Sequence, residues 1–234
     1  IPNLPNPIIG FFEDFGFFYK TTDGGETWML QNQTQESQNI LQMEFVDDQT
    51  GFYVTQNNVW KSIDGGVNWE TLNGNSQNFN FTQIDFISDL VMFGYNNSHI
   101  YKSIDGGVNW EQKGYFESNG ISNVVHISFV DENTGFIHRG NSDTNWGTEG
   151  IYKTTDGGQN WELIDNYWWP IVDDLEYINK TFGYLATGGT GLLKLDEDGG
   201  QDGTISFPVA GWNWEIDPYN FDVINENTVV FEVY

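Results

Sequence analysis

The sequence predicts an all-β protein assembled from repeated four-stranded sheets, and three observations support this prediction. The chain of 234 residues holds 18 Phe, 11 Tyr and 10 Trp but only two alanines, Ala186 and Ala210. Aromatic and β-branched side chains pack well on a pleated sheet, whereas alanine favours helices. The second observation is a ten-residue motif that recurs along the chain, and the third is the spacing of its copies by 41 to 51 residues.

The recurring motif is YKTTDGGETW, which first occupies residues 19–28. Further copies occupy residues 60–69, 101–110 and 152–161, and a degenerate copy, LKLDEDGG, begins at Leu193. The lysines of successive copies lie 41, 41, 51 and 41 residues apart. Units of about 40 to 50 residues are typical of the four-stranded blades of a β-propeller. We therefore expect residues 1–234 to form a single β-propeller domain, with repeats near 20–28, 61–69, 102–110, 153–161 and 194–203.

The second repeat gives the expected order of strands within one blade. A first strand over about 42–46 leads into FVDDQTGFYV, where a polar turn ending in glycine precedes a second strand over about 51–55. A third strand is expected over about 59–63, and a fourth begins near Trp69. The Asp-Gly-Gly sequence at 64–66 then lies in the hairpin between the third and fourth strands, where glycine adopts positive φ without steric cost.

The other repeats follow the same order. FVDENTGFIH from Phe129 and YINKTFGYLA from Tyr177 are further pairs of first and second strands. Residues 16–30 contain only third and fourth strands, and residues 221–234 contain only a first pair. Joined, the two ends make one blade, so we expect five blades closed by pairing of the N- and C-terminal strands, which protects exposed strand edges. An additional strand over 8–12 makes six blades the alternative.

The repeated turns resemble the Asp-box, or BNR, repeat with its pattern S/T-x-D-x-G-x-x-W, and copies begin at Thr21, Ser62, Ser103 and Thr154. This repeat marks β-propellers such as sialidases, sortilin-type receptors, xyloglucanases and photosystem assembly factors. The resemblance implies a structural role, in which the aspartate binds amides of its own turn and the tryptophan packs between neighbouring sheets. The residues assigned to this role are Asp23, Trp28, Asp64, Trp69, Asp105, Trp110, Asp156 and Trp161.

Charge and composition exclude several classes of partner. Eight Lys+Arg against 34 Asp+Glu give a net charge of -26. A field of this sign repels phosphate backbones and anionic bilayers, so nucleic acid is not expected as a partner. No apolar run approaches the ~20 residues that cross a bilayer, so direct membrane insertion is not expected. The chain has no cysteine, which excludes disulfides and thiolate sites.

A candidate binding face lies opposite the repeated turns. In a four-stranded meander, the turns after the first and third strands lie at one end of the sheet and the other connections lie at the opposite end. The longest connections at that opposite end carry Tyr167 and five tryptophans, beside His138 and the only arginine, Arg139. These tryptophans are Trp146, Trp168, Trp169, Trp212 and Trp214. Tryptophans on polar loops bind the faces of sugar rings or anchor protein interfaces. For Trp212 and Trp214, packing between blades is the alternative.

The sequence argues against catalysis. Sialidases, which the repeat resembles, hold their substrate carboxylate with three arginines, and one arginine cannot replace three. We therefore expect no enzyme, with a glycoside hydrolase as a remaining alternative because 34 acidic residues include many carboxylate pairs. The candidate metal is calcium, because Asp196, Asp198 and Asp202 crowd hard oxygen ligands into one turn. No other cofactor is expected.

The expected function is non-catalytic recognition by an extracellular or envelope-associated module. Its tryptophan-bearing face binds a neutral glycan or a protein partner. The first alternative is a scaffold for assembly or secretion of a membrane protein complex, in which case the partners include a larger envelope complex. Localisation outside the cytoplasm is expected from the acidic, Asn-rich composition and from a first residue, Ile1, that is not methionine.

Overall fold

The computed structural model describes residues 10–14, 17–33, 40–55, 58–72, 81–96, 99–116, 122–141, 150–165, 172–187, 191–205, 218–225 and 228–233. Every regular element in these ranges is a β-strand, which confirms the all-β prediction. Within the same ranges, no helical segment has the length and apolar character that crossing a bilayer needs.

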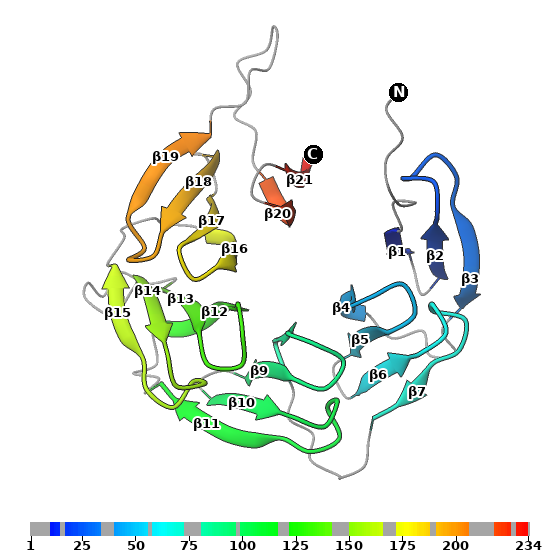
Figure 1. Ribbon diagram of the computed structural model, residues 1–234, viewed down its shortest axis with the longest axis horizontal. Helices are drawn as coiled ribbons and strands as arrows, with labels where there is room; N and C mark the ends of the chain where they lie inside the picture. The colour runs from blue at the N-terminus through cyan, green and yellow to red at the C-terminus, as the bar shows by residue number, and fades with distance from the viewer. Residues whose placement is uncertain are drawn as a thin grey trace, which may run out of the picture. The chain divides into compact units, whose positions relative to one another are not determined.

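The described strands form antiparallel sheets in which each strand pairs with its neighbour in sequence (Figure 1). The first sheet has three strands and the last has two, and between them come four sheets of four strands each. The first and last sheets comprise β1 (Gly10–Asp14), β2 (Phe17–Thr21) and β3 (Met29–Gln33), and β20 (Pro218–Asn225) and β21 (Thr228–Val233). The four-stranded sheets comprise β4 (Ile40–Phe45), β5 (Gly51–Thr55), β6 (Val59–Ser62) and β7 (Glu70–Thr71); β8 (Gln83–Phe86), β9 (Met92–Asn96), β10 (His99–Ser103) and β11 (Glu111–Tyr115); β12 (Ser122–Phe129), β13 (Gly135–Asn141), β14 (Gly150–Thr154) and β15 (Glu162–Asp165); and β16 (Val172–Asn179), β17 (Phe182–Thr187), β18 (Gly191–Asp196) and β19 (Gln201–Ile205).

The strand order predicted for the second repeat matches β4 to β7 closely. The predicted hairpin glycines, Gly65 and Gly66, have φ of 71° and 87°. Only glycine adopts this conformation without strain, so the Asp-Gly-Gly sequence fixes the hairpin. The equivalent glycine pairs of the first, third and fourth repeats also have positive φ.

The chain divides into two compact units, residues 1–92 with 103–110 and residues 93–102 with 111–234. β1 pairs with β2, and β20 pairs with β21. β1 is the additional N-terminal strand that the sequence suggested, at 10–14 instead of 8–12. Because β1 and β20 belong to different units, pairing of the chain ends stays a prediction, as do the single domain and the five or six blades.

Successive sheets pack through stacked aromatic rings. The phenylalanine near the start of the second strand of one sheet lies against the aromatic residue near the end of the first strand of the next. The three stacked pairs are Phe52 with Phe86, with ring centroids 4.8 Å apart, Phe93 with Phe129 at 3.5 Å, and Phe136 with Tyr177 at 3.4 Å. Such pairs add to the stabilisation gained from burying the rings themselves. The repeated sequence therefore supplies both sides of the packing between sheets.

A glycine precedes the stacked phenylalanine in two of these sheets because an aromatic ring covers it. A Cβ placed on Gly51 would lie 2.5 Å from the Phe45 ring, and one on Gly135 would lie 2.4 Å from the Phe129 ring. No side chain fits there without moving the ring. The glycine after the polar turn therefore leaves room for the aromatic residue at the end of the first strand.

Candidate functional site

Four repeat turns join the last two strands of their sheets; they are residues 21–28, 62–69, 103–110 and 154–161. In the second, Asp64 accepts hydrogen bonds from the Ser62 hydroxyl at 2.9 Å, the Asn68 amide at 2.8 Å and the Asn68 side chain at 2.7 Å. The Ser62 oxygen accepts the Gly66 amide at 2.9 Å. Equivalent bonds surround Asp23, Asp105 and Asp156.

These bonds hold the turn aspartates in the ionised form. Hydrogen bonds from the Thr27 side chain and then from the Thr27 amide lower the pKa of Asp23 to about 2. Bonds from the amide and side chain of Asn160 likewise lower the pKa of Asp156. A carboxylate that accepts several donors stays charged and exchanges no proton near neutral pH. The contacts of these aspartates are those of a structural residue.

The tryptophans of the second and fourth repeat turns pack between sheets, whereas Trp28 of the first repeat turn is 40 % exposed. The Trp69 indole donates to the Gly66 carbonyl at 3.0 Å. Its ring centroid lies 4.8 Å from that of Phe18 in the preceding sheet and 4.8 Å from that of Tyr53 in its own sheet. Trp110 and Trp161 make the corresponding bonds to Gly107 and Gly158 at 2.9 Å and 3.0 Å. The ring and its N–H group therefore serve the packing of the repeat.

A lysine before each repeat turn connects its sheet to the next. The ammonium groups donate to main-chain carbonyls in a turn of the following sheet; the pairs are Lys20 with Asp48 at 2.9 Å, Lys61 with Asp89 at 3.2 Å, Lys102 with Glu132 at 2.8 Å and Lys153 with Glu197 at 2.9 Å. The ammonium groups of Lys61, Lys102 and Lys153 also lie 5.2 to 5.5 Å from the centroid of the stacked phenylalanine of their own sheet. We call each lysine, with its carbonyl and ring, a sheet joint.

The first glycine of the receiving repeat turn makes room for the joint. A Cβ on Gly65 would lie 2.8 Å from the Lys20 nitrogen and 3.2 Å from the Asp48 carbonyl oxygen. The Gly65 amide also donates to the Gln49 carbonyl at 2.8 Å. The Asp-Gly-Gly sequence therefore has two functions, since it forms the hairpin and leaves space for the lysine of the previous sheet.

Most of the predicted ligand-binding residues lie outside the described residues. These are Trp146, Tyr167, Trp168, Trp169, Trp212 and Trp214. They belong to three connections, residues 142–149, 166–171 and 206–217, and the strands on either side of each connection are described. The ends of those strands show where the connections start.

The strand ends that flank these connections lie at one end of two neighbouring sheets. Across the sheet of β12 to β15, His126 pairs with His138, His138 with Ile151 and Ile151 with Asp165. The His126 ring nitrogen lies 3.3 Å from the carbonyl oxygen of Val172, where the neighbouring sheet of β16 to β19 begins. In that sheet, Val172 pairs with Thr187, Thr187 with Gly191 and, next to it, Leu192 with Ile205. All three tryptophan-bearing connections therefore leave their sheets at the end opposite the repeat turns.

The other two predicted ligand-binding residues are buried. His138 and Arg139 are 8 % and 7 % exposed, on β13. The Arg139 guanidinium carbon lies 4.9 Å from the Phe116 centroid and 5.6 Å from the Tyr152 centroid, as in a cation–π contact. Burial of His138, with the neighbouring charge of His126, lowers its pKa to about 3. The structure thus gives both residues packing contacts, and a direct role in ligand binding stays a prediction.

The predicted calcium site is described in part. The Asp196 carboxylate accepts the amides of Asp198 at 3.0 Å and of Gly200 at 2.7 Å, so it closes its own turn. In the described ranges, no group of three or more His, Asp and Glu side chains has an arrangement that holds a metal ion. The side chain of Asp202 lies outside the described ones, and calcium binding stays a prediction.

Several solved structures share this fold at low sequence identity. A structure of YCF48 bound to D1 peptide is 17% identical, with a TM-score of 0.60 over 92% of this chain and 68% of that chain. YCF48 from Cyanidioschyzon merolae is 13% identical, with a TM-score of 0.63 over 92% of this chain and 70% of that one. The GH74 enzyme of Niastella koreensis is 17% identical, with a TM-score of 0.59 over 83% of this chain and 35% of that one.

The fold is that of a β-propeller. At these identities the likeness establishes the fold alone, and the chain spans about a third of the GH74 enzyme, 35% of it. No protein-family model matches the sequence, and the comparison with curated proteins gives no match.

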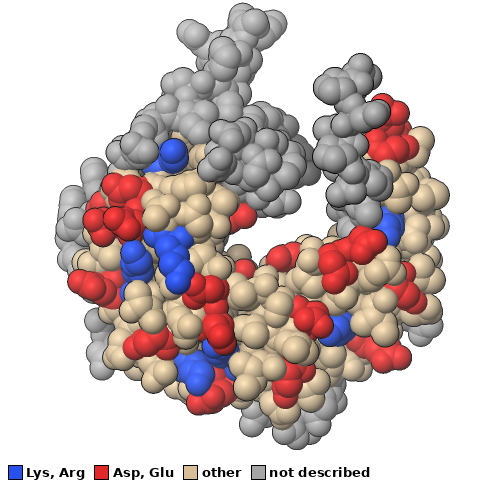
Figure 2. Space-filling model, viewed as in Figure 1, with Lys and Arg blue, Asp and Glu red and all other residues tan. Residues whose placement is uncertain are grey.

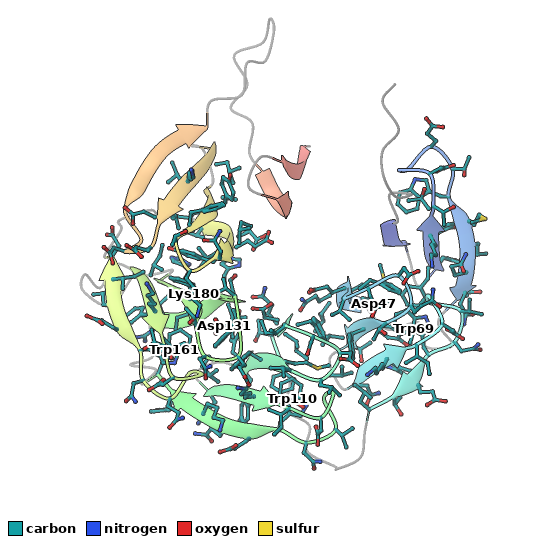
Figure 3. The ribbon with its side chains drawn as sticks, viewed as in Figure 1. Asp47, Trp69, Trp110, Asp131, Trp161 and Lys180 are labelled. Carbon is teal, nitrogen blue, oxygen red and sulfur yellow. The ribbon has the colours of Figure 1, made fainter. Side chains whose placement is uncertain are left out.

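The sequence did not reveal two kinds of contact within this propeller. The recurrence of the lysine was visible, but its acceptor is a main-chain carbonyl, which has no sequence signature. The second contact is an ion pair between neighbouring sheets, in which the Lys180 nitrogen lies 2.6 Å from a carboxylate oxygen of Asp131 (Figure 3). Lys180 replaces the acidic residue that other repeats carry in the turn after the first strand. This difference between repeats was the sequence signal that could have indicated the ion pair.

Proposed function

We propose that this propeller is a non-catalytic recognition module, and that it binds a protein partner through the three tryptophan-bearing connections. The observation that carries the proposal is the convergence of the flanking strand ends at one end of two neighbouring sheets. Five tryptophans in those connections supply the large, rigid side chains that dominate protein interfaces. The solved YCF48 structure with a bound peptide supports a protein partner over a glycan.

A role outside the cytoplasm, as a secreted module or as a scaffold for assembly or secretion of an envelope complex, is part of the same proposal. The acidic, Asn-rich sequence supports it. A neutral glycan is the second ligand class, and the test includes it because a GH74 enzyme has the same fold. The two ligand classes differ in how their binding depends on salt, because a basic protein partner binds this chain of charge -26 partly through long-range electrostatic attraction.

The test compares the native protein with the double variant Trp146→Ala/Trp168→Ala on a glycan array and on an array of peptides from envelope proteins. We expect peptide binding that weakens by on the order of tenfold or more in the double variant, because anchoring aromatic residues carry most of an interface's energy. Binding should also weaken as salt shortens the Debye length from ~10 Å at 0.1 M.

The matched control is Tyr115→Ala, which removes an exposed aromatic side chain from β11. It should bind like the native protein. Peptide binding that is equal in the native protein and the double variant contradicts the proposed face. Binding to a neutral glycan that is lost in the double variant but unaffected by salt contradicts the protein partner and selects the glycan.

A further inference from the structure

Exposed apolar side chains lie on the second and third repeat turns and on a turn bonded to the third. Ile63 is 74 % exposed and Ile104 is 69 % exposed, at equivalent positions of the second and third repeat turns. Leu90, in the turn between β8 and β9, is 51 % exposed. Val67 and Val108 are also exposed. We call these five residues the apolar turn patch, and all of them belong to the first compact unit.

The other repeats show that the fold does not require apolar residues at these positions. The first and fourth repeat turns carry Thr22 and Thr155 where the patch has isoleucine. They carry Glu26 and Gln159 where it has valine. In place of Leu90, the equivalent turns of the second and fourth repeats have Gln49 and Asn133. In all four repeat turns the aspartate accepts the amide four residues later, so this bond does not depend on the apolar side chains.

Hydrogen bonds hold the two repeat turns and the Leu90 turn together. The Gly106 amide donates to the Leu90 carbonyl at 2.9 Å, which places Leu90 beside the third repeat turn. Lys61, one residue before the second repeat turn, donates to the Asp89 carbonyl at 3.2 Å. The Leu90 turn is therefore bonded to the third repeat turn directly and to the strand before the second through Lys61, and each of the three turns carries an exposed apolar side chain. A monomeric protein rarely leaves such a patch open unless it binds something.

The charge around the patch is mostly negative. Segments 46–50, 63–68, 87–91 and 104–109, which form the turns on this surface, contain five aspartates and no lysine or arginine. The face in view in Figure 2 carries many more acidic than basic side chains. Two nearby lysines, Lys20 and Lys61, direct their ammonium groups into sheet joints. A second copy of this chain, with its charge of -26, is repelled from such a surface.

We propose that the apolar turn patch binds a basic amphipathic segment of a partner protein. Apolar side chains of the segment contact Ile63, Leu90 and Ile104, and its lysines or arginines lie against the surrounding aspartates. Burial of the apolar side chains supplies the affinity, and the acidic border supplies attraction and orientation. This surface shares no residue with the tryptophan-bearing connections, so it gives the propeller a second docking site.

The experiment uses the variant Ile63→Thr/Leu90→Asn/Ile104→Thr, in which each new residue is the one that another repeat carries at the equivalent position. The probe is a fluorescent synthetic helix of leucine and lysine, and binding is measured by anisotropy. We expect the triple variant to bind the probe on the order of tenfold more weakly than the native protein, because it removes most of the apolar contact area and no charge. The control variant Leu30→Asn/Leu163→Thr replaces exposed leucines elsewhere and should bind within about twofold of the native protein.

Three outcomes contradict the proposal. One is equal affinity of the native protein and the triple variant for the leucine and lysine helix. Another is equally tight native binding to a lysine and serine peptide of the same charge, which would show attraction by charge alone. The third is native self-association in sedimentation experiments that the triple variant abolishes, which would make a second copy the occupant. Thermal melts of all three proteins establish that each is folded.

Discussion

At the scale of single residues, His138 is a neutral group in a place where a charge is costly. Its side chain projects from β13 and is buried, and its Nδ1 atom has no hydrogen-bond partner among the described residues. It pairs across the strands with His126, whose Nδ1 lies 3.5 Å from Asp174 Oδ1. Burial, followed by the repulsion from His126, lowers the pKa of His138 from 6.5 to about 3. His138 therefore remains unprotonated in the folded protein at neutral pH.

This burial predicts a loss of stability in mild acid. The unfolded chain binds a proton at His138 below about pH 6.5, but the folded protein does so only near pH 3. The contribution of neutral His138 to the free energy of unfolding is complete above pH 6.5 and is lost as the pH falls from 6.5 toward 3. The variant His138→Phe removes the titrating group, so its urea midpoint should fall less than that of the native protein between about pH 6.5 and 4.5.

A second titration at lower pH serves as the internal reference for this comparison. The pKa of Asp131, whose carboxylate is partly desolvated but bonded to Lys180 and to turn amides, falls from 3.8 to about 2. Its stabilisation is present above pH 3.8 and lost as the pH falls toward 2, equally in the native protein and in His138→Phe. Parallel profiles of the two proteins above pH 4.5 would show that His138 does not cause the loss in mild acid.

At the scale of elements, the sheet joint combines three interactions in one place. The ammonium group of Lys102 donates to the Glu132 carbonyl at 2.8 Å and lies 3.6 Å from a Glu132 carboxylate oxygen. It also lies 5.2 Å from the centroid of Phe93, which stacks on Phe129 of the next sheet. The Lys102 side chain is only 11% exposed, so the joint is shielded from water better than a surface ion pair.

Replacement of the joint lysine should destabilise the protein more than the loss of its charge alone. We expect Lys102→Met to lower the free energy of unfolding by about 1 to 2 kcal/mol, because a charged hydrogen bond is lost and the carbonyl stays partly buried. The control is Lys113→Met, which removes a lysine paired with Glu111 of its own strand at 2.7 Å. Chemical denaturation of both variants measures the difference, and equal losses would show that the bond between sheets contributes nothing.

The elements were more predictable than the contacts between them. The bounds of β4 to β7 follow from the second repeat because a local pattern of strands and glycine turns determines them. The turn network of Asp64 also followed, because every partner lies within four residues of it. The sheet joints were not predicted, because donor and acceptor are 28 to 44 residues apart and the acceptor is main chain. The burial of His138 was missed because it depends on packing between sheets. The apolar turn patch was not predicted, because the exposure of its side chains depends on how the turns fold.

At the scale of the whole molecule, the first and last of the described sheets are smaller than the others. Among the described residues the first sheet has three strands and the last has two, while the four between them each have four. An incomplete sheet leaves strand edges open, and a propeller avoids this by closing on itself. The sequence of β20 and β21 follows the pattern of the first two strands of a repeat. Pairing of this hairpin with the N-terminal sheet remains our prediction for closure.

Hydrogen exchange measures this closure directly. Deletion of residues 229–234 removes most of β21, and the exchange of β20 amides should rise because their partner strand is lost. If the ends pair, the amides of β1 and β2 should lose protection as well and the melting temperature should fall sharply, because opening one edge releases the remaining sheets. Unchanged protection of β1 and β2, with a small change in melting temperature, would show that the ends do not meet.

The four sheet joints have a common direction, since each lysine donates to a carbonyl that comes later in the chain. The second, third and fourth repeats therefore each carry a donor for the next repeat and an acceptor for the previous one. A duplicated or deleted repeat brings both halves with it, and its acceptor needs no particular side chain. Duplication or deletion of a repeat can thus change the number of sheets without requiring a new interface. The side chains of the accepting turns can then vary and acquire roles in binding.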